Sequence, residues 1–226
     1  MNDEELHSNP IASRPRPTFS FLAILSIVAF SLVTGMLGYW FGVRQWSGPG
    51  EDSPDVGFAR DMMTHHAQAV DMATLLRDRT DDPEMRQLAL DIMLTQQAQI
   101  GQMQGWLTLW GYPIARTEPA MSWMGMPTSG PMPGMATPEQ INQLRGLTGV
   151  EADGLFLQLM IAHHRSGVAM GQAALARAQR PEVRALAQSI VDAQTSEITL
   201  MQELLQQKGL PPVPEEENMN HGTVTP

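Results

Sequence analysis

The chain is constrained most by an internal duplication. A shift of 98 residues superposes Phe58 on Phe156, and it carries a shared pattern over about fifty residues without a gap. The other matched pairs include Asp55/Asp153, Met62/Met160, His65/His163, His66/His164, Met72/Met170, Pro83/Pro181, Gln96/Gln194 and Met103/Met201. A repeat this regular indicates two copies of one structural unit.

Each copy predicts a hairpin of two long helices. In the first copy, residues 55–79 keep apolar side chains three or four positions apart, as an amphipathic helix does. Residues 82–84 (Asp-Pro-Glu) supply an N-cap, a proline for the first helical position and an acid for the helix dipole. Gly111 ends this second helix, and residues 180–182 (Arg-Pro-Glu) begin its counterpart in the second copy.

The apolar stripes of these helices predict how the hairpins pack. Four helices with one apolar face each bury those faces best as a four-helix bundle, so we expect an all-α fold over residues 55–210. A crossover, residues 112–137, joins the copies, a short helix follows from Thr137 to Gly146, and residues 211–226 form a flexible tail. The stripes of the second helices are Met85, Leu88, Ile92, Ile100, Met103 and Leu107, and Val183, Leu186, Ile190, Ile198, Met201 and Leu205.

A membrane anchor is predicted before the bundle. Residues 18–43 contain no charged side chain, and as a helix they would span about 39 Å, more than the ~30 Å hydrocarbon core of a bilayer. Tyr39 and Trp40 lie near the far end, where interfacial aromatic residues are common. A cleaved signal peptide is the alternative, but the run is long for one and no small-residue cleavage site follows it.

The charges that flank this span predict its orientation. Arg14 and Arg16 precede the span and only Arg44 closely follows it, which favours a cytoplasmic N-terminus. We therefore expect residues 1–17 in the cytoplasm and residues 44–54 as a linker to an extracytoplasmic domain, in the periplasm or at the cell exterior.

Composition narrows the possible partners. The formal net charge is −10 and no basic cluster is present, which argues against a nucleic-acid partner. Cysteine is absent, which excludes disulfides and thiolate metal sites. The chain instead carries 17 methionines, and four of its six histidines form two adjacent pairs. Thioethers and imidazoles together indicate soft-metal chemistry.

The paired histidines belong to a doubled M-x-x-H-H motif. Met62 precedes His65 by three residues and His66 by four, so a sulfur and an imidazole share a helix face. Met72 lies two turns beyond on that face. The second copy repeats the set as Met160, His163, His164 and Met170.

We expect a pseudo-twofold pairing of the first helices to bring the two motifs together at mid-bundle. Adjacent histidines differ by about 100° in direction, so one of each pair should point into the bundle and the other to a helix–helix boundary.

The motif departs from that of di-iron bundles. Those proteins carry Glu three residues before His on facing helices, whereas Met stands there in this chain. A thioether suits Cu(I) better than iron or manganese. Gln96, Gln99, Gln194 and Glu197 interrupt the second helices and could orient the imidazoles or ligate. The alternative is an ordinary core, in which methionine fills space and buried histidines are simply hydrogen-bonded.

The crossover adds a second group of candidate ligands. Thioether clusters bind Cu(I) and cannot be lost to disulfide formation outside the cytoplasm. We expect these sulfurs to be exposed in a surface loop, and their Cu(I) binding to persist at low pH, whereas histidine ligands should protonate near pH 6.5. A flexible loop packed on the bundle is the alternative. The methionines are Met121, Met124, Met126, Met132 and Met135.

The two copies also resemble a known family. The runs MPGMATPEQINQLRGLTGVEADGLFLQLMIAHHRSGVAMGQAAL and FARDMMTHHAQAVDMA are similar to the signature of the ferritin-like family known as domain of unknown function 305. The resemblance implies a ferritin-like four-helix bundle and, from characterised periplasmic members, copper binding and copper tolerance. The resemblance implies that the candidate copper ligands are the two M-x-x-H-H sets and the methionines that follow them, Met72 and Met170.

The leading prediction is a membrane-anchored, extracytoplasmic protein that buffers or sequesters copper, as Cu(I) and through its imidazoles as Cu(II), without being an enzyme. No phosphate-binding loop, nucleophile elbow or zinc-protease motif is present. Two alternatives stay open: a metal-dependent oxidase in the bundle core, and a structural helical module of the envelope that binds no metal. The expected partners are a metal ion and the membrane, and a homo-oligomer is left open.

Overall fold

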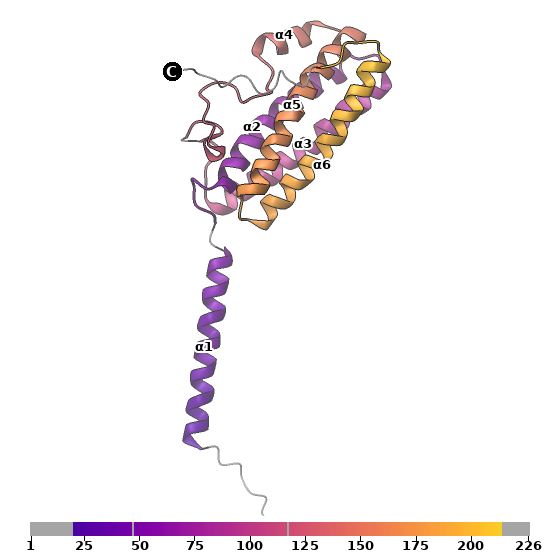
Figure 1. The fold of residues 1–226 in the computed structure, drawn as a ribbon. Coiled ribbons are helices and arrows are strands. Elements are labelled where there is room, and N and C mark those ends of the chain that lie inside the picture. Colours follow the sequence, from indigo (N-terminus) through magenta and orange to yellow (C-terminus); the bar gives the residue numbers. More distant parts are fainter. Residues whose placement is uncertain (1–19, 47, 117, 214–226) are drawn as a thin grey trace, which may run out of the picture. The chain divides into compact units, whose positions relative to one another are not determined.

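The computed structural model describes residues 20–46, 48–116 and 118–213. The predicted cytoplasmic segment 1–17 and most of the predicted tail lie outside these ranges. The chain divides into two compact units, residues 1–47 and 48–226. Within the described ranges the secondary structure is six α-helices and one short 3₁₀ helix, with no strand, so the expectation of an all-α chain is confirmed (Figure 1).

The first unit contains one apolar helix, α1 (Phe21–Trp46). Its segment Phe21–Gly42 is long and apolar enough to cross a membrane, and none of that segment is buried by other parts of the protein. A signal sequence would have the same character. The helix continues through residues 44–46, which were expected to belong to the linker.

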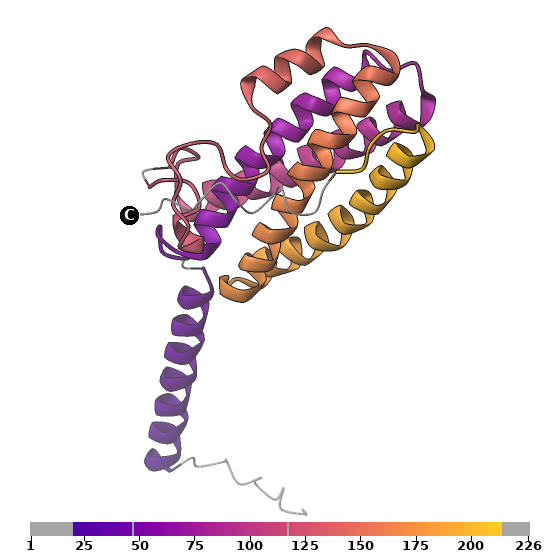
Figure 2. The ribbon, with the colours of Figure 1, turned by 45° about the horizontal axis from the view of Figure 1, so that its top comes forward.

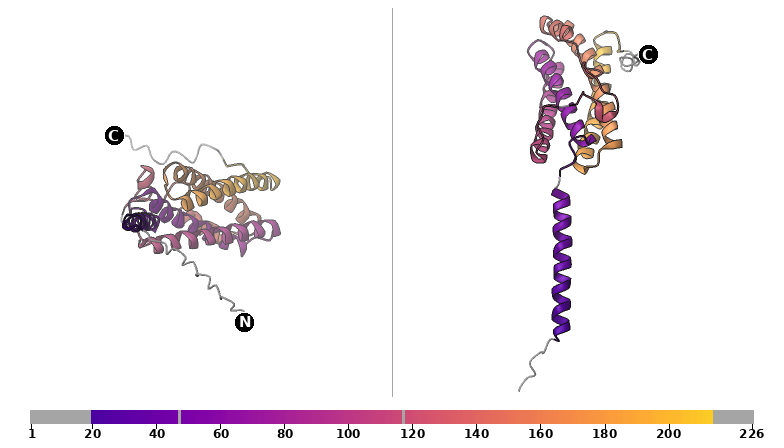
Figure 3. Two further views of the ribbon diagram at one scale, coloured as in Figure 1. Left: turned by 90° about the horizontal axis from the view of Figure 1, so that it is seen from below. Right: turned by 90° about the vertical axis from the view of Figure 1, so that its left-hand side faces the viewer.

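The second unit is a bundle of two helical hairpins. Helices α2 (Pro54–Arg77) and α3 (Pro83–Trp110) form one hairpin, and α5 (Gly149–Arg177) and α6 (Pro181–Gln207) form the other. The hairpins make two layers and meet through α2 and α5 (Figure 3). The predicted four-helix bundle of duplicated hairpins is confirmed.

Local signals account for where the helices begin and end. The Asp82 carboxylate accepts a hydrogen bond from the Glu84 amide, and Pro83 follows at the first helical position. Gly111 ends α3 with a φ of 80°, a conformation that favours glycine. Thr137 and Gln140 form a capping box at the start of α4 (Pro138–Gly146), the short helix expected there.

The core consists of two apolar clusters that are related by the duplication. The Phe58 cluster contains Phe58, Met62, Met103, Leu107, Met170, Val183, Leu186 and Ile190, together with smaller side chains and crossover residues. The Phe156 cluster contains Phe156, Met160, Met201, Leu205, Met72, Met85, Leu88 and Ile92, together with others. The 98-residue shift maps the members named for one cluster onto those of the other, so the bundle is pseudo-symmetric. Of the predicted stripe positions, Ile100 and Ile198 are only partly buried.

The crossover packs on the α2 side of the bundle (Figure 2). Its 3₁₀ helix η1 (Ser122–Met124) lies against α2, where the buried carboxylate of Asp61 anchors the segment. Asp61 accepts hydrogen bonds from the Met121 amide (2.7 Å) and the Trp123 indole (3.0 Å), and it pairs with Arg116.

The expectation that the crossover sulfurs are exposed is wrong for most of them. Met121 and Met132 are 2% and 3% exposed and belong to the Phe58 cluster, and Met124 and Met135 are partly buried against it. Met126 is 55% exposed. The reason is that Asp61 holds the loop against an apolar surface, where burial of methionine is favourable.

Candidate metal centre

The four histidines of the doubled motif lie together in the middle of the bundle, and all four are fully buried. The rings of His65 on α2 and His163 on α5 stack, with centroids 3.6 Å apart and ring planes 29° apart. The two motifs therefore meet where the hairpins meet. We call these four side chains, with Gln96 and Gln194, the histidine layer.

The second histidine of each pair turns toward the other helix of its own hairpin. His66 Nε2 lies 2.7 Å from Gln99 Oε1 on α3, and His164 Nε2 lies 2.7 Å from Glu197 Oε2 on α6. His163 Nε2 lies 2.9 Å from the backbone oxygen of His65. Because these oxygens accept hydrogen bonds, Nε2 carries the proton in each ring and Nδ1 carries the lone pair.

The histidine layer contains most of the unpaired buried polar atoms in the described part of the chain. These are Nδ1 of all four histidines, Nε2 of His65, and both amide ends of Gln96 and Gln194. Asp153 Oδ1 is the only other such atom among the described residues. Buried polar groups in native proteins are almost always hydrogen-bonded. This concentration therefore points to a layer that receives a ligand or water.

The two glutamines occupy matched, buried positions in the two copies. Gln194 packs against Gly167, one turn along α5 from His163, so closely that a Cβ at Gly167 would lie 2.2 Å from Gln194 Oε1. Gln96 is the matched position in the first copy. The sequence marked both as interruptions of an apolar stripe that could orient the imidazoles or ligate.

The motif methionines of the two copies are shared between the two apolar clusters. Met62 and Met170 share the Phe58 cluster, and Met160 and Met72 share the Phe156 cluster. Each cluster thus takes one methionine from each copy, and Met72 does not join Met62. The clusters also contain Met103 and Met201. Met103 and Met201 are a matched pair under the 98-residue shift. This match is the sequence signal that could have added them to the candidate ligands.

The environment favours the neutral form of three imidazoles, those of His65, His66 and His163. Burial lowers the pKa of His66 to about 3, against a smaller opposing effect of the Gln99 hydrogen bond. Burial, followed by the charge of His163, lowers the pKa of His65 well below its usual value. Burial, followed by the charge of His164, does the same for His163. Neutral imidazole is the form that binds metal. For His65, His66 and His163 in the folded protein, the expectation of titration near pH 6.5 is therefore wrong.

The donor types fit a soft metal ion, although the side chains do not converge on one point. Within the described ranges, no group of three or more His, Asp or Glu side chains is arranged to hold a metal ion. The lone pairs of stacked imidazoles lie in their ring planes and cannot both meet an ion between the rings. An ion between the rings that is held by both His65 and His163 would therefore require one of these rings to rotate.

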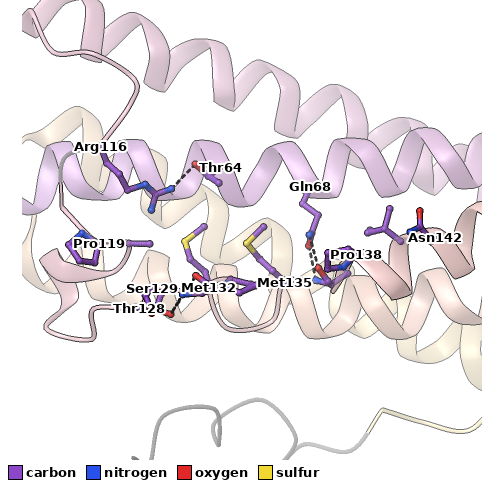
Figure 4. A pocket seen from close by; sticks show the side chains of 15 residues that line it. Thr64, Gln68, Arg116, Pro119, Thr128, Ser129, Met132, Met135, Pro138 and Asn142 are labelled. Carbon is purple, nitrogen blue, oxygen red and sulfur yellow. Dashed lines mark hydrogen bonds between the residues drawn. The ribbon is translucent and has the colours of Figure 1, made fainter.

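Two crossover methionines face a cavity of about 710 Å³. Figure 4 shows Met132 and Met135 between Arg116 at one end and Gln68 at the other. The Gln68 side chain makes two hydrogen bonds with the Ala136 backbone. Its Oε1 accepts from the Ala136 amide at 2.7 Å, and its Nε2 donates to the Ala136 carbonyl oxygen at 2.9 Å. Among the crossover candidates, Met121, Met124 and Met126 do not line this cavity.

Comparisons with known proteins place the bundle in a family. Solved relatives include "putative secreted protein DUF305" from Streptomyces coelicolor, which is 47% identical, covers 72% of this chain and 98% of its own, and has a TM-score of 0.70. CopM in its Cu(I)-bound form is 26% identical, with a TM-score of 0.52 and coverage of 68% of this chain and 96% of its own. The Cu(II)-bound form is 28% identical, with a TM-score of 0.56 and coverage of 69% and 97%.

A curated relative is an uncharacterized protein of Acanthamoeba polyphaga mimivirus, 39% identical over 49 residues. That match covers 22% of this chain and 32% of the viral protein, so the chain spans about a third of that relative. Residues 55–205 match the family described as domain of unknown function (DUF305), a match that takes in all four bundle helices. The chain belongs to the DUF305 family.

Proposed function

We propose that this chain binds copper outside the cytoplasm and buffers or sequesters it, with the histidine layer and its flanking thioethers as the principal ligands. CopM has been solved with Cu(I), with Cu(II) and with silver, and a second DUF305 relative is named as a secreted protein. These neighbours support a copper-related, extracytoplasmic role.

The observation that carries the proposal is the hydrogen bonding of the histidines. His66, His163 and His164 each donate Nε2–H to an oxygen and keep a buried Nδ1 lone pair without a partner. Metal-binding histidines typically have this arrangement. The hydrogen bond donated by one ring nitrogen fixes the orientation of the ring and raises the basicity of the other nitrogen, which binds the metal. A purely structural core would be expected to satisfy both nitrogens.

The thioethers favour copper over harder metals. Each apolar cluster contains four buried methionines from the bundle helices: Met62, Met63, Met103 and Met170 in the Phe58 cluster, and Met72, Met85, Met160 and Met201 in the Phe156 cluster. Thioether sulfur is a soft ligand that suits Cu(I) and cannot supply the oxygen-rich shell preferred by magnesium or calcium. Met132 and Met135 at the crossover cavity provide a second, more accessible thioether pair.

The apolar helix supports a membrane location for this chemistry. We propose that residues 18–43 anchor the chain in a single pass, with the N-terminus inside and the bundle outside. Segment Phe21–Gly42 is long and apolar enough to span a bilayer. The absence of cysteine also suits an oxidising compartment, because a thioether ligand is not lost to disulfide formation.

A Cu(I) competition titration of the full chain in detergent tests the proposal. A chromophoric chelator reports affinity for the parent and for a variant with leucine at His65, His66, His163 and His164. We expect the variant to lose the tight component, while a variant with leucine at Met132 and Met135 loses a weaker one. Met126→Leu changes an exposed methionine and is the control. Equal binding by the parent and the histidine variant would favour a structural bundle instead.

A further inference from the structure

The two halves of the histidine layer are not identical, and one difference lies in a pair of matched side chains that contact the second histidines. Gln99 contacts His66 in the first copy, and Glu197 contacts His164 in the second. We infer that this pair makes the layer two unequal half-sites: the His164 half prefers a divalent ion, Cu(II), and the His66 half prefers a monovalent ion, Cu(I) or Ag(I). The inference rests on the proposed function and concerns the selectivity of the same site.

The pseudo-symmetry makes the two contacts of the second histidines directly comparable. Both contacts join a histidine Nε2 to a side-chain oxygen at 2.7 Å. Both histidines are fully buried, and in both Nδ1 has no partner. The matched glutamines Gln96 and Gln194 are likewise buried and unpaired in each half. At this contact the first copy has the amide of Gln99 and the second copy has the carboxylate of Glu197.

A carboxylate behind an imidazole alters what the imidazole can bind. The Glu197 carboxylate accepts a hydrogen bond from Nε2–H of His164, which raises the basicity of Nδ1 on the far side of the ring. It also adds a negative charge beside a fully buried imidazole, on a side chain that is itself partly buried. Coulomb attraction is proportional to the charge of the ion, so a divalent ion gains twice the free energy of a monovalent one. Gln99 is neutral and offers no such advantage.

The expected sizes follow from this proportionality. Loss of a carboxylate that supports a metal-binding histidine typically lowers metal affinity by about 10–100-fold. If that loss applies to Cu(II), the loss for Ag(I) should be near its square root, about 3–10-fold. The ratio of Cu(II) affinity to Ag(I) affinity should therefore fall by about 3–10-fold in Glu197→Gln. A general loss of structure would lower both affinities without this selective change in their ratio.

The test uses the full chain in detergent and exploits the repeat. Glu197→Gln makes both halves neutral, and Gln99→Glu gives both a carboxylate. Glu203→Gln makes the same change of charge at an exposed position on α6 and is the matched control. Cu(II) and Ag(I) affinities are measured by competition with chelators. Electron paramagnetic resonance reports the nitrogen ligands of bound Cu(II).

Each result bears on the inference. We expect Glu197→Gln to lower the Cu(II)/Ag(I) ratio, Gln99→Glu to raise it and to add a second Cu(II) signal, and Glu203→Gln to leave it unchanged. If the parent binds both ions but neither layer variant changes the ratio beyond the control, the selectivity inference fails and the proposed function stands. If the parent binds neither ion, both fail.

Discussion

Acid should unfold the bundle because folding disfavours the protonated form of three buried histidines, His65, His66 and His163. In the unfolded chain a histidine binds a proton near pH 6.5. In the folded protein, burial lowers the pKa of His66 to about 3 and lowers those of His65 and His163 well below the usual value. Between these limits the unfolded state binds more protons than the folded state, so stability must fall as pH falls.

The size of this effect follows from the structure. For His66, the interval from 6.5 to about 3 corresponds to a loss of about 5 kcal/mol by pH 3, at about 1.4 kcal/mol per pH unit. A typical domain is stable by only about 5–15 kcal/mol. His65 and His163 add contributions of the same sign. The loss begins below pH 6.5, and together the three can steepen the slope to about 4 kcal/mol per pH unit.

The assay is urea unfolding of a fragment that begins at Gly48, followed by circular dichroism between pH 7.5 and pH 4. This fragment contains both apolar clusters, and α1 contributes no residue to either. Buffers are kept free of metal, because an ion bound at Nδ1 would itself stabilise the folded state. We expect the free energy of unfolding to fall steadily below pH 6.5.

A histidine variant separates this cause from general acid effects. His66→Leu removes one titrating group and should reduce the slope by about 1.4 kcal/mol per pH unit. Carboxylates that lose ion pairs act at lower pH, mostly below about pH 5. A parent whose stability stays constant from pH 7 to pH 5 would refute the reasoning and would mean that the layer is open to water or already charged.

Other predictions concern the crossover, the bundle and the anchor. Gly134→Ala should lower stability by about 1–3 kcal/mol, because Gly134 has a φ of 75° and a Cβ there would lie 2.6 Å from the Ala162 oxygen. Thermal unfolding measures this loss, and Gly130→Ala, at a position with space for a Cβ, is the control. Asp61→Ala should cost about 2–4 kcal/mol by leaving crossover donors unpaired, and protease cleavage of the crossover should accelerate. The Gly48 fragment should be soluble and almost wholly helical, and appreciable sheet in its circular dichroism would contradict the fold. Protease added to spheroplasts should digest the bundle, whereas full protection would reverse the proposed topology.

Local sequence was sufficient for the helices and their order. The residues that begin and end them act within one turn, such as the Asp82 N-cap, Pro83 and the capping box at Thr137. The 98-residue repeat then implied two equal hairpins, and equal units that share an apolar face pack most simply about a pseudo-twofold axis. The meeting of the two histidine motifs follows from that symmetry.

The partners of each side chain depended instead on the packing of helices that are distant in sequence. Periodicity put Met62 and Met72 on one face, yet the crossing of α2 and α5 sends them to opposite clusters. No local pattern reveals that Asp61 would fasten a Met-rich loop and bury Met132, or that burial would lower the pKa of His66 to about 3. Helix propensity and capping act over three or four residues, whereas burial and hydrogen-bond partners depend on which surfaces meet in space.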